Sequence, residues 1–123
     1  MADKRKSLGV RGENAACAYL DRRGLKVLER NWKCGYGEAD IIALDQKTLV
    51  FCEVKTRRST SAGRPEDSIT RKKQERYYKI AQVYRSRTTA RHTAVRFDVI
   101  TLQVDKDDKG ARLQYFPNAF GLA

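Results

Sequence analysis

Residues 37–56, GEADIIALDQKTLVFCEVKT, decide the fold prediction for this chain. Two apolar runs, residues 38–44 and 48–56, are joined by a connection that is too short for a crossover between parallel strands. The runs therefore predict an antiparallel hairpin. Charged residues interrupt both runs, and burying charge is unfavourable unless the charge is paired or binds a metal. The candidate site consists of these interrupting residues: Glu38, Asp40, Glu53 and Lys55.

The turn of this hairpin determines which charged side chains are neighbours. A turn centred between residues 46 and 47 places Asp40 opposite Glu53, and it places Glu38 opposite Lys55. Directly opposed residues share a face, with their Cβ atoms about 4.5–5.5 Å apart. Residues two apart on one strand share that face as well. All four side chains are therefore expected on one side of the hairpin, at the end away from the turn.

Two carboxylates this close together indicate a metal site. They repel each other, and one stays protonated unless a cation lies between them. Mg²⁺ or Mn²⁺ prefers oxygen ligands and keeps several waters, so Asp40, Glu53 and the main-chain carbonyl of Val54 form a suitable ligand set. Lys55 would orient or deprotonate an attacking water, or stabilise the transition state. A phosphodiester is the scissile group that suits such a cation-rich site.

The length and charge of the chain agree with a single domain that binds a polyanion. With 123 residues, the chain is long enough for one domain, residues 1–123, with its own apolar core. Its 26 Lys and Arg residues exceed its 15 Asp and Glu residues, which gives a net charge of +11. This excess favours nucleic acid as the partner, and an acidic membrane surface is the second choice.

The sequence shows neither a targeting signal nor a cysteine framework. The basic N-terminus, expected to be flexible over residues 1–7, is not followed by the apolar run of a secretory signal. No apolar stretch approaches the roughly 18 residues of a membrane span. The three cysteines, Cys17, Cys34 and Cys52, lack CxxC spacing, which disfavours disulfides and a zinc site. We therefore expect a cytoplasmic protein without membrane association, in which Cys17 and Cys52 are small core residues.

The remaining elements are predicted from apolar periodicity. Helical spacing predicts helices at residues 8–20 and 65–85, and β-prone runs predict further strands at residues 25–32, 94–104 and 111–116. The predicted order is α-β-β-β-α-β-β. Because the central strands are apolar on both faces, helices should cover both sides of a mixed sheet. The fold class is therefore α/β.

Two cations of the second predicted helix lie inside its apolar stripe. Lys73 and Arg76 either extend to the edge of the stripe or face the active-site cleft, and Lys73 is the stronger auxiliary candidate. Asp98 is interpreted as a structural strand residue. Basic residues near the start of this helix are expected to contact phosphates, with a solvated basic loop as the alternative. These residues are Arg57, Arg58, Arg64 and Lys72.

The motif Asp40, β-turn, Glu53-Val54-Lys55 resembles the PD-(D/E)xK nuclease superfamily, whose core is a sheet flanked by helices in αβββαβ order. The longer set GENAACAYL, GEADIIALD, LVFCEVKTRRS, RFDVI and NAF is similar to the YraN family of small, endonuclease-like proteins of unassigned function. This similarity extends over residues 8–120. It implies a restriction-endonuclease-like core and a metal-dependent nuclease site.

The resemblance also implies roles for two further acids. Glu13 would be the helix-borne acid that reaches the same metal as Asp40 and Glu53, as in archaeal Holliday-junction resolvases. Glu38, in the family's Gly-Glu-x-Asp motif, would lie alongside. The superfamily's proline before the aspartate is replaced by Ala39 in this sequence.

Three functional hypotheses follow from the sequence. The first is an Mg²⁺- or Mn²⁺-dependent endonuclease acting on DNA and selective for branched or junction structures. The second is a non-catalytic nucleic-acid-binding protein that retains the nuclease fold, and the third is an adaptor for another protein. The intact acid set favours the first, because acids that face DNA without a metal would repel it. The sequence leaves RNA as a substrate and the oligomeric state open, although symmetric cleavage of a junction would require a homodimer.

Overall fold

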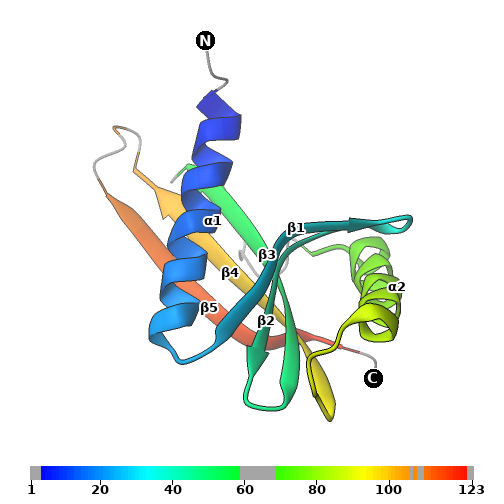
Figure 1. The fold of residues 1–123 in the computed structure, drawn as a ribbon. Coiled ribbons are helices and arrows are strands. Elements are labelled where there is room, and N and C mark those ends of the chain that lie inside the picture. The colour runs from blue at the N-terminus through cyan, green and yellow to red at the C-terminus, as the bar shows by residue number, and fades with distance from the viewer. Residues whose placement is uncertain (1–3, 59–68, 106, 108–109, 122–123) are drawn as a thin grey trace.

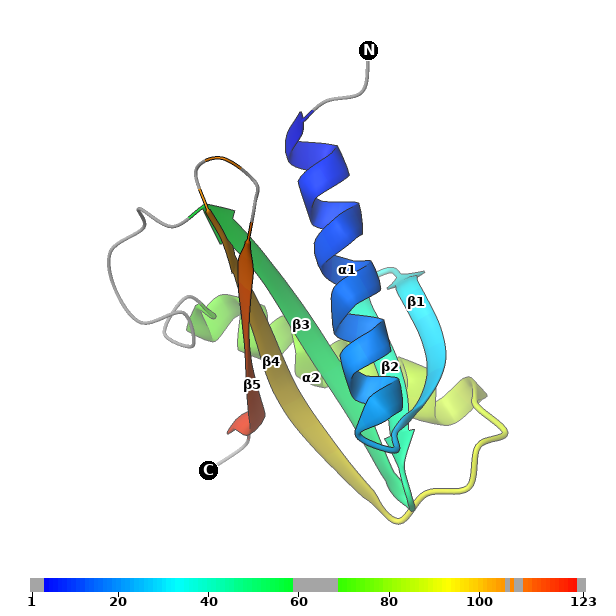
Figure 2. The same cartoon turned by 90° about the vertical axis from the view of Figure 1, so that its left-hand side faces the viewer.

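The computed structural model describes residues 4–58, 69–105, 107 and 110–121. These residues form an α/β domain whose elements follow the predicted order. Figures 1 and 2 show a single sheet with one helix on each side. The elements are α1 (Lys4–Arg22), β1 (Lys26–Cys34), β2 (Gly37–Asp45), β3 (Thr48–Arg58), α2 (Arg71–Arg87), β4 (Ala94–Val104) and β5 (Ala111–Phe120).

The sheet is mixed, as predicted from the sequence. Its five strands lie in the order β1-β2-β3-β4-β5. Neighbouring strands are antiparallel except β3 and β4, which are parallel. A parallel pair needs a long crossover connection, and the segment containing α2 supplies it. Pro117 lies in the edge strand β5, where a missing backbone N–H is tolerated.

The two helices cover opposite faces of the sheet because the central strands bury apolar side chains on both sides. On the α1 face, Ala16 and Leu20 pack with Ile41, Val50 and other residues of β2 to β4. Cys52 is buried in this cluster and Cys17 packs against it, in agreement with the prediction. The cluster on the α2 face comprises Ala39, Ile42, Leu49, Phe51, Tyr77, Ile80, Ala81, Tyr84 and Phe97.

Three predicted boundaries are wrong by several residues. Helix α1 begins at Lys4, so residues 4–7 of the segment expected to be flexible are helical. Helix α2 begins at Arg71 rather than Pro65, because the Thr70 hydroxyl accepts a hydrogen bond from the Lys73 N–H and caps the helix. Pro65 itself lies outside the described residues. Strand β5 continues past the predicted residue 116 to Phe120.

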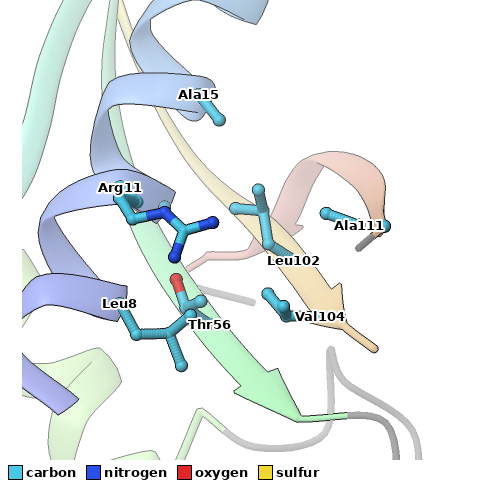
Figure 3. A pocket seen from close by; sticks show the side chains of 9 residues that line it. Leu8, Arg11, Ala15, Thr56, Leu102, Val104 and Ala111 are labelled. Atoms are coloured by element: carbon cyan, nitrogen blue, oxygen red, sulfur yellow. The ribbon is translucent and has the colours of Figure 1, made fainter. Parts of the chain in front are cut away.

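A largely apolar cavity of about 290 Å³ opens between α1 and the sheet (Figure 3). The Arg11 guanidinium lies beside the Thr56 side chain at its mouth. Its described lining consists of Leu8, Arg11, Gly12, Ala15, Thr56, Leu102, Val104, Gly110 and Ala111. None of these lining residues is an acid, a histidine or a cysteine, the usual side-chain ligands of metals and the usual general bases. The candidate chemistry therefore lies on the other face of the sheet.

Candidate active site

Strands β2 and β3 part where the predicted acids lie. Their ladder has the predicted register as far as the pair Ile41–Cys52. The paired residues end there, one position before Asp40 and Glu53. Beyond this point the Val54 N–H donates a hydrogen bond to Asp40 Oδ2 at 2.8 Å. The carboxylate thus satisfies a backbone donor of β3, which fixes Asp40 beside the strand that carries Glu53.

The predicted cross-strand pairs beyond Ile41 are therefore not part of the ladder. Glu38 pairs with Lys33 of β1 on one side of β2, and it has no ladder partner in β3 on the other side, so it is not paired with Lys55. This prediction was wrong because it assumed that β2 and β3 remain paired along their whole length. The departure of β2 separates the two strands at this end of the hairpin.

A cleft of about 210 Å³ brings together the predicted site residues Glu38, Asp40, Glu53 and Lys73, whereas Lys55 is not among its described lining residues. Helix α2 forms one wall of it, and β2 and β3 form the other. Lys73 and Arg76 both line the cleft, so of the two predicted alternatives they face the site rather than extend away from it. The described lining residues are Glu38, Asp40, Glu53, Lys73, Arg76, Tyr77 and Ile80.

Glu53 is the most deeply buried acid of the cleft, with 4% of its surface exposed. The Lys73 ammonium donates a hydrogen bond to Glu53 Oε1 at 2.9 Å. The other oxygen, Oε2, is buried and has no hydrogen-bond partner among the described residues, and the same is true of the Tyr77 hydroxyl. Buried polar atoms are normally satisfied by protein groups, waters or ions. These two atoms on the cleft wall are therefore suited to an additional polar ligand.

The electrostatics of the cleft favour a cation. Burial, together with the charge of Glu53, raises the pKa of Asp40 to about 8. Without a cation, Asp40 is consequently protonated through most of the neutral range. A divalent ion between the two carboxyl groups would favour the ionised form of Asp40. The donor set therefore fits a hard, oxygen-preferring ion such as Mg²⁺ or Mn²⁺.

The two lysines of the site differ in pKa. Burial, followed by the charge of Lys73, lowers the pKa of Lys55. Burial also acts against the charged form of Lys73, but the hydrogen bond and the charge of Glu53 outweigh it and raise the pKa of Lys73. Lys73 is thus a fixed cation, whereas Lys55 is the lysine that releases a proton more readily.

Glu13 is not assembled with the carboxylate pair as a third ligand. Its Oε1 accepts a hydrogen bond from the side-chain amide of Asn31 at 3.1 Å. Its charge nevertheless makes a small contribution to the raised pKa of Asp40. Within the described residues, no group of three or more His, Cys, Asp and Glu side chains is arranged to hold a metal ion. The structure thus brings together the pair Asp40 and Glu53, rather than the three acids that the resemblance implies.

The sequence profile of the uncharacterised protein family UPF0102 matches residues 12–102, which extend from α1 into β4. The chain belongs to this family. A UPF0102 protein of Geobacter sulfurreducens is 44% identical over 118 residues, which are 96% of this chain and 91% of the relative. A UPF0102 protein of Pelotomaculum thermopropionicum is 40% identical over 120 residues, or 98% and 100% of the two chains. One of Dictyoglomus turgidum is 40% identical over 115 residues, or 94% and 98%.

The predicted phosphate-binding residues of this UPF0102 chain lie near the end of β3 and the start of α2. Arg57 and Arg58 are the last two residues of β3, and the charge of Arg57 contributes to the lowered pKa of Lys55. Lys72 is exposed in the first turn of α2. Arg64 lies outside the described residues.

None of the helices among the described residues is long and apolar enough to cross a membrane.

Tyr77 is a cleft residue that the sequence interpretation missed. Its ring packs in the apolar core on the α2 face. Its buried hydroxyl, however, lies within the electrostatic influence of Glu53 and Asp40, although burial is the main cause of its raised pKa. The spacing of Lys73 and Tyr77, one helical turn apart, is the signal that could have revealed this role.

Asp98 is structural, as predicted. Arg96 Nε donates a hydrogen bond to Asp98 Oδ1 at 2.9 Å, and Arg96 Nη2 donates to Oδ2 at 3.1 Å. The Tyr115 hydroxyl also donates to Oδ2, and the Asn118 N–H donates to Oδ1 at 2.8 Å. Both oxygens of this fully buried carboxylate are thus hydrogen-bonded within the domain.

Proposed function

We propose that this UPF0102 chain is a divalent-metal-dependent nuclease that hydrolyses phosphodiester bonds in DNA, with Asp40 and Glu53 as metal ligands. The observation that carries the proposal is the buried Glu53 carboxylate, which leaves one oxygen without a partner beside Asp40. A buried, partly satisfied carboxylate lowers the stability of a fold unless a ligand completes it. A cleft with two acids and flanking cations supports a ligand that is itself a cation, together with an anionic substrate.

The residues in the cleft and beside it divide into three roles. Asp40 and Glu53 would hold Mg²⁺ or Mn²⁺, which would neutralise charge on the phosphate and lower the pKa of the attacking water. Lys73 would hold the Glu53 carboxylate in place through their 2.9 Å contact. Lys55, whose pKa is lowered, is the candidate for orienting or deprotonating the attacking water.

The charge of the whole chain supports DNA as the substrate. A net charge of +11 attracts a polyanion over a long range. Arg76 in the cleft, with Lys72 one turn earlier on α2 and Arg57 near the end of β3, would contact phosphates on either side of the scissile bond. The fold carries no separate base-reading module among the described elements. We therefore propose selectivity for DNA structure, such as a branch or junction, rather than for base sequence.

The test combines metal binding with cleavage on the same samples. Mn²⁺ is titrated by calorimetry into wild type, Asp40→Ala and the control Asp21→Ala, which removes an exposed acid of α1. Cleavage of branched, single-stranded and duplex DNA is then followed with and without Mn²⁺. We expect Asp40→Ala to lose both metal binding and cleavage while Asp21→Ala retains them.

The opposite result defines the alternative function. Wild-type protein that binds DNA but neither binds Mn²⁺ nor cleaves would overturn the nuclease proposal and support a non-catalytic binding protein. Circular dichroism of each variant shows whether a loss of Mn²⁺ binding is caused by removal of a ligand or by unfolding of the protein. Asp40→Ala removes the acceptor of the Val54 N–H, so Asp40→Asn, which keeps an acceptor oxygen, serves as the second variant.

A further inference from the structure

The tip of the β1–β2 hairpin lies above α2 in the view of Figure 1. The last pair of this hairpin is Cys34–Gly37, so Gly35 and Tyr36 form its turn. Tyr36 is 52% exposed and is one of two exposed large hydrophobic residues in the described part of the chain, the other being Val10. A single exposed tyrosine is ordinary. Tyr36 differs from an ordinary exposed tyrosine because a cation of α2 lies next to its ring.

A cation of α2 accompanies the Tyr36 ring. The Lys79 ammonium lies 5.4 Å from the ring centroid, which is within the range of a cation–π contact. Further along the same hairpin, the Arg87 guanidinium lies 6.0 Å from the Trp32 ring. The hairpin thus carries two aromatic rings, each with its own cation from α2. Aromatic rings next to cations are the combination that binds single-stranded nucleic acid.

Close backbone contact connects the hairpin tip to the cleft. Gly37 has φ of +139°, and a Cβ at this position would lie 2.8 Å from Cδ of Arg76. Only glycine fits this conformation and this approach without strain. Arg76 itself lines the cleft, and so does Glu38, the residue that follows Gly37. The tip is therefore packed on α2 at the cleft entrance.

We propose that Tyr36 is a stacking platform for an unpaired nucleobase of the substrate strand. Lys79 and Arg76 would contact the phosphates that flank this base. Asp40 lies four positions after Tyr36, a span of about 13 Å along an extended strand, so the stacked base would belong to a nucleotide a short distance from the one in the cleft. In a duplex the bases are already stacked, and exposing one requires energy. The proposal rests on the proposed function for the position of the scissile phosphate, and it names the substrate class as DNA with unpaired nucleotides.

The experiment measures binding without turnover. Single-stranded oligonucleotides containing 2-aminopurine, and matched fully paired duplexes, are titrated with protein in EDTA, and both fluorescence and anisotropy are recorded. The variants are Tyr36→Ala, Tyr36→Phe, which keeps the ring, and Val10→Ala, which removes an equally exposed apolar side chain on α1. We expect Tyr36→Ala to weaken single-strand binding roughly 5- to 150-fold and to lose the 2-aminopurine quench. Tyr36→Phe and Val10→Ala should behave as wild type, and duplex binding should be unchanged in every variant.

Two results of this binding assay would overturn the proposal. One is single-strand binding that is the same in Tyr36→Ala and in wild type, or absent from both. The other is an equal loss of single-strand and duplex binding in Tyr36→Ala, which would indicate a general electrostatic or structural effect. Because the assay contains no metal, failure of the proposed function is seen separately in the Mn²⁺ titration. Metal binding and cleavage that persist unchanged in Tyr36→Ala on single strands would leave the nuclease proposal standing and remove this one.

Discussion

Two buried carboxylates on opposite faces of the sheet have different surroundings. Asp98 of β4 lies on the α1 face, fully buried, and Arg96, Tyr115 and the Asn118 N–H satisfy both of its oxygens. Glu53 of β3 lies on the α2 face, and Lys73 satisfies only one of its oxygens. A buried carboxylate whose oxygens are both hydrogen-bonded has no free acceptor for a ligand. A buried carboxylate with one unsatisfied oxygen is stabilised by an additional hydrogen-bond donor or cation. Burial alone therefore does not distinguish a structural acid from a functional one.

The largest expected difference between these two acids is in catalysis. Glu53→Gln removes a proposed metal ligand, so cleavage should fall by more than the roughly 10- to 100-fold that loss of outer-shell partners causes. Asp98→Asn should keep the cleavage rate per folded molecule, because Asp98 lies on the other face. Single-turnover cleavage in Mn²⁺, corrected for the folded fraction, measures both. Equal rate losses in the two variants would contradict the distinction.

Stability should show the reverse order. Arg96→Met leaves Asp98 buried without its ion pair and should lower the free energy of unfolding by about 3–5 kcal/mol. Lys73→Met should lower it by less, because Lys73 is one-third exposed and Glu53 borders the cleft. Urea unfolding of the metal-free proteins provides the comparison. A larger loss for Lys73→Met would show that the α2 face carries the structural ion pair.

Packing on the α1 face can be tested with two glycines of the same helix. A Cβ at Gly12 would clash with Thr56 Oγ1, whereas a Cβ at Gly9 would meet nothing within 4 Å. Gly12→Ala should therefore lower the free energy of unfolding by about 1–3 kcal/mol. Gly9→Ala should raise it by about 0.5–1 kcal/mol through helix propensity. Thermal unfolding of both variants measures these changes. In the double variant Gly12→Ala with Thr56→Ala, the stability should partly recover if the Thr56 side chain is the source of the clash.

A further expected effect is a pH dependence of stability that comes from Asp40. Its pKa is raised from 3.8 to about 8 in the folded protein, so the folded state binds more protons than the unfolded state between these values. Its contribution is fully present below pH 4 and is lost as the pH rises through 8. Asp40→Asn should flatten this slope in EDTA. Denaturant midpoints at several pH values measure it, and parallel slopes in wild type and variant would contradict the assignment.

The sequence was sufficient for the hairpin and for its register. A turn centred between residues 46 and 47 predicted the register of β2 on β3, and the structure has that register from Asp45–Thr48 to Ile41–Cys52. The capping signal at Thr70 was present in the sequence as well, but the interpretation passed over it and began the helix too early. Such features could be predicted because they depend on neighbours in the chain.

The sequence by itself determined the order of the elements, the mixed sheet covered on both faces and the pair of acids at one end of the hairpin. Only the tertiary structure decided which groups contact those acids. The β2–β3 ladder ends at Ile41–Cys52, and beyond it Asp40 accepts a hydrogen bond from the Val54 N–H. Lys73 of the next helix donates a hydrogen bond to Glu53. The tertiary structure also separated Glu53 from Asp98, whose partners come from β4 and β5. The physical reason is that periodicity and turn length fix local conformation, whereas the satisfaction of a buried charge depends on side chains that meet only when distant segments pack.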